Sequence, residues 1–208
     1  MTTKNHQEPI PELPIQGIYS FSGDSNVVRF EVQWTTKSFG VICDLDLHAY
    51  VFDERARFIE RLDLSNNHTF DKAMMLVADQ ETTGQAQTSN VASESVKIDF
   101  RLVDPAVAAV LFVLDGGSKY FQLVQLMEVN MMPLNTSKTV SMPGQTAPLG
   151  LFTFSDKGRK ENQAVGLAVL FRDGWTEEDA GKVQWKMRAI MEPIEVSAKR
   201  DKDDKVCP

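Results

Sequence analysis

Apolar residues recur at every second position in one segment of this chain after another, and this spacing limits the folds open to it. The segments 28–34, 45–51 and 96–102 show it most clearly, with apolar side chains on one face and polar ones on the other. An amphipathic helix would instead repeat its apolar residues at intervals of three and four. The alternation therefore predicts β-strands that each bury one face.

Nine segments have this strand pattern, and polar turns separate them. The segment 108–115 is apolar on both faces, which is typical of a central strand. Residues 80–95 and 173–184 read as polar loops. This pattern predicts an all-β fold, a two-sheet antiparallel β-sandwich of about nine strands. The predicted strands are 27–34, 44–52, 73–79, 96–102, 108–115, 120–132, 149–155, 164–172 and 183–190.

The two ends of the chain differ in composition from the part between them. Residues 1–16 contain three of the prolines and read as an extended leader, either a stiff linker or a docking peptide. Within residues 195–208 the segment KRDKDDK alternates in charge and lacks apolar residues, which predicts a disordered tail. We therefore expect one folded domain over residues 17–194.

Charge and cysteine content narrow the classes of partner and compartment. The net charge of -7 disfavours nucleic acid and anionic membranes, because an acidic surface repels phosphate groups. Two distant cysteines favour a reduced, cytoplasmic protein. The first residues lack the apolar core of a secretory signal, and no run of apolar residues is long enough to cross a bilayer.

Acidic and amide side chains cluster near several predicted strand ends. Asp44 and Asp46 lie two residues apart, so both carboxylates point to the same side of a strand. Carboxylate and amide oxygens are the ligands that Ca²⁺ prefers. The same acids could instead cap turns or face solvent. The candidate calcium ligands are Asp44, Asp46, Asn66, Asn67, Asp79 and Glu94.

No arrangement of residues points to catalysis. The chain has three scattered histidines and lacks the G-x-S-x-G, H-E-x-x-H and phosphate-loop motifs. We therefore expect a protein that is not an enzyme. Trp34 and Trp185 fit the apolar faces of their strands, whereas Trp175 follows a glycine in a loop and is the better candidate for an exposed contact.

The order of several segments resembles the tellurium-resistance TerD-like family. The segments are FEVQW, CDLDLHAYVFDE, LSNNHTF, MLVADQETTG, VKIDFRLVDPAVAAVLFVLDGG, LAVLFRDGW and WKMRAI, and together they cover about residues 17–194. The resemblance implies a calcium-binding β-sandwich without established enzymatic chemistry. It also implies a role in stress resistance, protein partners in multi-protein assemblies, and peripheral association with membranes. In the family, residues matching Asp44, Asp46, Asn66, Asn67 and Asp79 belong to the calcium site.

The chain also departs from the family pattern. Thr35 stands where relatives have an aspartate, and the segment ASES leaves Glu94 as the single acid where relatives have an acidic run. Calcium affinity follows the number of charged ligands. We therefore expect a TerD-like binding module with a weakened calcium site, acting through protein partners. The alternative is a structural or scaffold subunit of a larger assembly that keeps the fold and has lost the ion.

Overall fold

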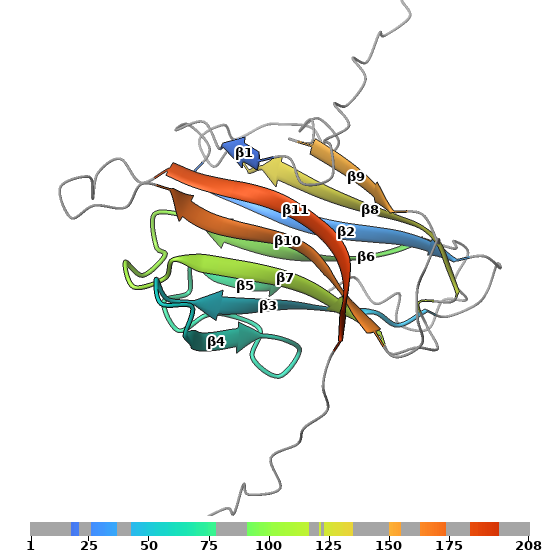
Figure 1. Ribbon diagram of the computed structural model, residues 1–208, viewed down its shortest axis with the longest axis horizontal. Helices are drawn as coiled ribbons and strands as arrows, with labels where there is room; N and C mark the ends of the chain where they lie inside the picture. The colour runs from blue at the N-terminus through green and yellow to red at the C-terminus, as the bar shows by residue number, and fades with distance from the viewer. Residues whose placement is uncertain are drawn as a thin grey trace, which may run out of the picture.

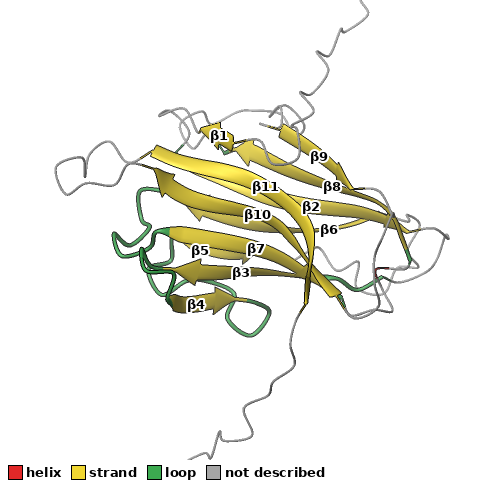
Figure 2. Ribbon diagram, viewed as in Figure 1, coloured by secondary structure: helices red, strands yellow, loops and turns green. Residues whose placement is uncertain are grey.

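Two antiparallel sheets packed face to face form the domain (Figure 1). The computed structural model describes residues 18–20, 26–36, 43–77, 91–116, 121, 123–134, 150–154, 163–173 and 184–195. Six strands form one sheet in the order β1-β11-β10-β7-β3-β4, and five form the other in the order β5-β6-β2-β8-β9. The predicted two-sheet antiparallel sandwich is confirmed, and Figure 2 shows how far strands dominate it.

The described residues form eleven strands. The six-stranded sheet contains β1 (Ile18–Ser20), β3 (Asp46–Phe52), β4 (Phe58–Leu62), β7 (Ala109–Asp115), β10 (Gln163–Asp173) and β11 (Gln184–Glu195). The five-stranded sheet contains β2 (Val27–Thr36), β5 (Met74–Val77), β6 (Val91–Asp99), β8 (Val124–Pro133) and β9 (Gly150–Phe154).

The core fills the space between the two sheets with the inward side chains of alternating strands. Phe30 of β2 and Phe112 of β7 are fully buried and stack across this space, with ring centroids 4.0 Å apart. Trp34 and Trp185 are buried, as their positions on apolar strand faces predict. β7 lies between β3 and β10, so the prediction of a central strand at 108–115 is also confirmed.

Three local predictions were wrong. β1 and β4 were not predicted, because they are short and β4 carries charge on both faces. Residues 91–95, predicted as loop, begin β6, where pairing with β2 outweighs the low strand propensity of ASES. The predicted alternation of 120–132 shifts at a register irregularity near the start of β8, so Gln125 is exposed rather than on the buried face of Met127.

A single arginine fastens the loop between β6 and β7 to the six-stranded sheet. The Arg172 guanidinium donates to the carbonyl oxygens of Val103 at 3.3 Å, Asp104 at 2.7 Å and Pro105 at 3.2 Å. It also lies 5.0 Å from the centre of the Trp185 ring. Burial lowers the pKa of this guanidinium. A group with several fixed donors is needed here, because the three carbonyls belong to one loop.

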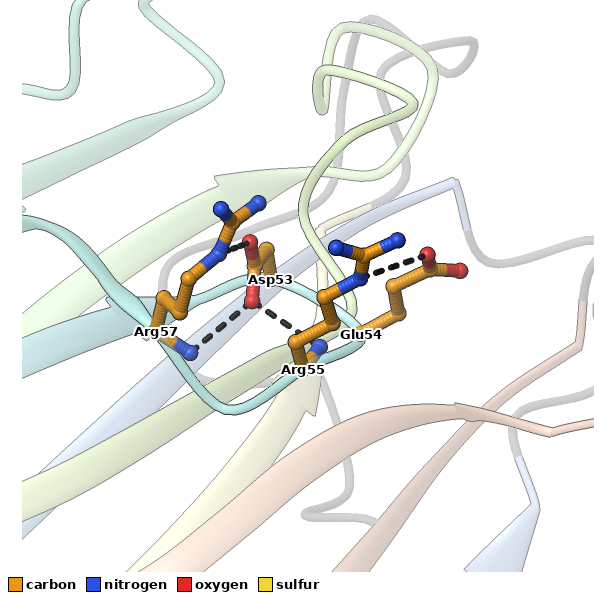
Figure 3. Close-up of polar contacts among 4 residues, drawn as sticks. All are labelled: Asp53, Glu54, Arg55 and Arg57. Carbon is orange, nitrogen blue, oxygen red and sulfur yellow. Dashed lines mark hydrogen bonds and ion pairs between the residues drawn. The ribbon is translucent and has the colours of Figure 1, made fainter.

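An aspartate organises the hairpin between β3 and β4 (Figure 3). Asp53 Oδ1 accepts from the backbone amides of Arg55 at 2.9 Å and Arg57 at 2.8 Å. Its Oδ2 accepts from Arg57 Nε at 2.7 Å. These bonds lower the pKa of Asp53, the backbone amide of Arg57 most of all. Ala56 completes the turn with a left-handed φ of 57°. Asp53 is thus a turn residue.

Replacing Arg172 by alanine should destabilise the domain, because it leaves the three loop carbonyls without their donor. We expect a loss of about 2–4 kcal/mol in the free energy of unfolding, measured by urea denaturation. The control is Arg55→Ala, since this side chain is 73% exposed and its ion pair with Glu54 is long at 4.0 Å. Equal stability of the two variants would contradict the role of Arg172.

Candidate functional site

Three aspartates lie near one another where β3 begins and β7 ends. Asp46 is the register partner of Asp115, and Asp44 lies two residues before it in an exposed position. Gly116 allows a close approach here, since a Cβ on it would come within 2.1 Å of the Leu45 side chain. We call Asp44, Asp46 and Asp115 the acidic end. Asp115 was not predicted as a site residue, although its place after an apolar strand and before two glycines was a usable signal.

The electrostatics of the acidic end disfavour a charged Asp46. Burial raises the pKa of the Asp46 carboxyl most, and the negative charges of Asp44 and Asp115 raise it further, while His48 acts in the opposite direction. In the folded state this carboxylate therefore pays a free-energy penalty for being ionised. A positive charge at this end would relieve that penalty.

Glu94 reaches the acidic end from the other sheet. Its Oε2 accepts a hydrogen bond of 2.5 Å from the backbone amide of Leu47, next to Asp46 in β3. The ladder between β3 and β4 ends at the pair Ala49–Leu62, two residues away, so Glu94 satisfies an amide that β4 does not reach. Glu94 thus contacts the β3 backbone at the residue after Asp46 and ties the two sheets together.

The asparagine pair lies in the segment that leads from β4 to β5. The Asn66 side-chain amide donates to the Arg61 carbonyl at 2.9 Å, and its backbone pairs with Asp63 across a tight turn. The Asn67 carbonyl accepts from the Leu76 amide at 2.7 Å. Both asparagines are exposed. Asp79, the remaining predicted ligand, lies outside the described residues, as does Trp175.

Asp63 accepts several hydrogen bonds within its turn, and it was not singled out from the sequence. Its Oδ1 accepts from the Ser65 hydroxyl at 2.5 Å and from the amides of Ser65 and Asn66 at 2.8 Å each. Arg61 forms an ion pair with its other oxygen. These contacts, with the Ser65 hydroxyl foremost, lower the pKa of Asp63 to about 2. It holds the turn in which Asn66 lies.

Histidine 48 lies beside the acidic end on the outer face of β3. Its pKa is lowered, mainly by burial and then by Arg61, against the opposing effects of Asp115, Asp46 and Asp63. The Asp63 turn and the acidic end therefore flank a neutral imidazole near physiological pH.

The described acids meet calcium's requirements only in part. Calcium takes six to eight oxygen ligands in most protein sites. Within the part of the chain that the structure describes, no three acidic, histidine or cysteine side chains are grouped closely enough to hold a metal ion. Asp44 and Asp46 fit as two neighbouring carboxylate ligands, and Glu94 already accepts a backbone bond. Two carboxylates fall short of the ligand set of a closed calcium site.

Comparison with known proteins finds similar solved structures, but no matching family model or curated protein. No protein-family model matches the sequence, and no curated protein matches it. Among solved structures, a homologue of the telluride resistance protein TerD from Streptomyces coelicolor A3(2), SCO6318, aligns with a TM-score of 0.52 and 16% identity over 82% of this chain and 90% of that one. This chain has a TerD-like fold.

A second solved structure agrees with the TerD-like fold. It is a protein of unknown function, SAV2460, with a TM-score of 0.53 and 15% identity over 83% of this chain and 91% of that one. At such identities the likeness concerns architecture alone. Within the described residues of the TerD-like domain, no helix has the length and apolar character required to cross a membrane.

Two aspartates of the same region should respond oppositely to loss of charge. Asp46→Asn should raise the melting temperature at pH 7 by roughly 1–3 °C, because it removes the repelled carboxylate. Since the folded pKa of Asp46 lies above its ordinary value of 3.8, the folded state binds more protons there, and wild-type stability contributed by this group falls as pH rises through that range.

Asp63→Asn is the matched comparison and should lower stability at pH 7, on the order of 2 kcal/mol, because it removes a favoured charge. Its folded pKa of about 2 lies below 3.8, so its contribution is present above 3.8 and is lost as pH falls toward 2. Thermal unfolding from pH 2 to 8 measures both effects. Destabilisation by both variants at pH 7 would contradict the repulsion at Asp46.

Proposed function

We propose that this TerD-like domain is a non-enzymatic binding module that acts through protein partners in a stress response and binds calcium weakly at its acidic end. The observation that carries the proposal is the gathering of Asp44, Asp46 and Asp115 at one end of a TerD-like sandwich. The likeness to a homologue of a telluride resistance protein supports the stress-response part.

Asp44 and Asp46 would hold the ion, and a bound divalent cation would supply neutralisation of their mutual repulsion. The raised pKa of Asp46 supports this assignment, since it reports an unfavourable negative potential. Glu94 and Asn66 already form hydrogen bonds to the backbone, and these bonds limit their availability as calcium ligands. With few charged ligands the affinity should be low, in the millimolar range of weak calcium sites.

The non-enzymatic part of the proposal rests on the structural role of the acidic residues that the structure describes. Asp53, Asp63, Asp71 and Asp99 each accept hydrogen bonds from backbone amides in turns. Such carboxylates are stabilised in the charged, accepting form, which suits turn formation better than proton transfer. The Cys43 side chain is buried in the core.

Calcium should raise the stability of the wild-type domain through the acidic end. In a chelator-treated sample, millimolar CaCl₂ should increase the melting temperature, because a ligand that binds only the folded state stabilises it. The effect should be lost in an Asp44→Asn/Asp46→Asn variant and retained in Asp99→Asn, whose aspartate lies at the end of β6. Calorimetric titration measures the affinity. Absence of both heat and stabilisation in the wild type would refute calcium binding.

A structural or scaffold subunit without calcium is the second candidate. It is favoured by one observation: the described side chains do not assemble three metal ligands. Purification of the tagged chain from its native source in the presence of a chelator separates the candidates. A complex of fixed stoichiometry that persists without calcium supports the scaffold, whereas one that forms only with calcium supports the binding module.

A further inference from the structure

The outer face of the six-stranded sheet is unusually apolar. In antiparallel sandwiches this face normally meets water and carries polar residues. Here β7 is apolar on both faces, and its outward residues Ala109 and Leu111 are only half-buried. Figure 2 shows this sheet at the front, with no described element across the middle of β7 and β10.

Two rows of apolar side chains run across the strands. Register pairs align Phe52, Ala109 and Phe171 in one row. The next row aligns Tyr50, Leu111 and Val169. At the β4 side Phe58 is 59% exposed and contacts the rings of both Tyr50 and Phe52. We call these seven residues the apolar face. A contiguous apolar surface of this kind marks an interaction site.

Charged residues border the apolar face on two sides, and the two borders have opposite sign. On the β11 side, Lys186 pairs in register with Phe171 and Arg188 pairs with Val169. Lys186 also forms an ion pair with Asp173 of β10, so Arg188 carries the net positive charge of this border. Further along β3 and β7 lies the acidic end, with Asp46 opposite Asp115. The basic border runs along a strand and the acidic border runs across strands, so they are about a right angle apart.

This pattern is complementary to itself. When two copies pack face to face about a two-fold axis with their strands nearly perpendicular, the basic border of each copy meets the acidic end of the other. Near-perpendicular packing is one of the two standard arrangements of stacked sheets. The apolar rows of the two copies then cover each other. We propose that the apolar face is the interface of a homodimer with this geometry.

The dimensions of the face suit such an interface. Six strands spaced by about 4.8 Å span about 24 Å, and the seven residues from Asp46 to Phe52 span about 20 Å in the other direction. The flat area is therefore about 500 Å². Two such faces would bury about 1,000 Å² in total, which lies at the weak end of interface sizes and fits a concentration-dependent dimer. Calcium and the basic border of the partner would both act on the acidic end, so the dimer is tested in the absence of calcium.

Sedimentation equilibrium of the full chain in chelator-containing buffer, from low to several hundred micromolar, tests the proposal. We expect a monomer–dimer equilibrium. Leu111→Lys should shift it at least tenfold toward monomer, because the charge would be buried at the centre of the interface. The charge reversal Arg188→Glu should weaken the dimer, and so should Asp46→Lys. The double variant that carries both reversals should restore the dimer. In it, the acidic residue at position 188 of each copy faces the basic residue at position 46 of the other.

Lys97→Glu is the matched control for charge reversal, because Lys97 lies on β6 in the other sheet. Its dimer should equal that of the wild type. A wild type that stays monomeric at every concentration overturns the proposal, as does a dimer that Leu111→Lys leaves unchanged in a folded protein. A wild-type monomer that dimerises only after deletion of residues 1–16 also overturns it, and would identify the leader as the cover of this face.

Discussion

Burial of the two inward sheet faces against each other is the interaction on which the rest of this structure depends. The stacked rings of Phe30 and Phe112 join β2 of one sheet to β7 of the other at full burial. Each strand contributes every second side chain to this layer, so the registers of neighbouring strands are constrained together. A slip of one residue in β7 would replace Phe112 by a residue of the outer face. The positions of the strand ends, and therefore of the acidic end, follow from this packing.

Two aspartates near strand ends have opposite electrostatic environments. Asp63 is surrounded by donors and is stabilised as a charge, whereas Asp46 faces other acids and is not. Asp63 therefore stabilises the fold, whereas the ionised Asp46 destabilises it. Unfavourable electrostatics retained at one place in a stable fold are a common feature of functional sites. This contrast, more than the number of acids, is what directs attention to the acidic end.

The two faces of the six-stranded sheet are both apolar, but for different reasons. Its inner face is apolar because it forms the core. Its outer face is also apolar along the rows through Leu111, which a sandwich does not require for folding. Charged residues lie along two borders of this surface and not at its centre, and that arrangement favours a partner with an apolar centre of its own. The sheet can thus serve folding on one side and association on the other.

The sequence by itself determined the fold class, most strands and the central place of residues 108–115. This was possible because the alternation of apolar and polar residues is a local pattern that shows which strand face is buried. It also predicted that Asp44 and Asp46 lie on one strand face, but β3 begins only at Asp46. Only the tertiary structure decided that Asp115 joins them, that Glu94 bonds the Leu47 amide, and that Asp63 rather than Asn66 organises its turn. Those relations depend on register between strands distant in the chain, which local patterns do not encode. The strand β4 and the start of β6 escaped prediction for the same reason, since pairing with their neighbours supplies what their own residues lack.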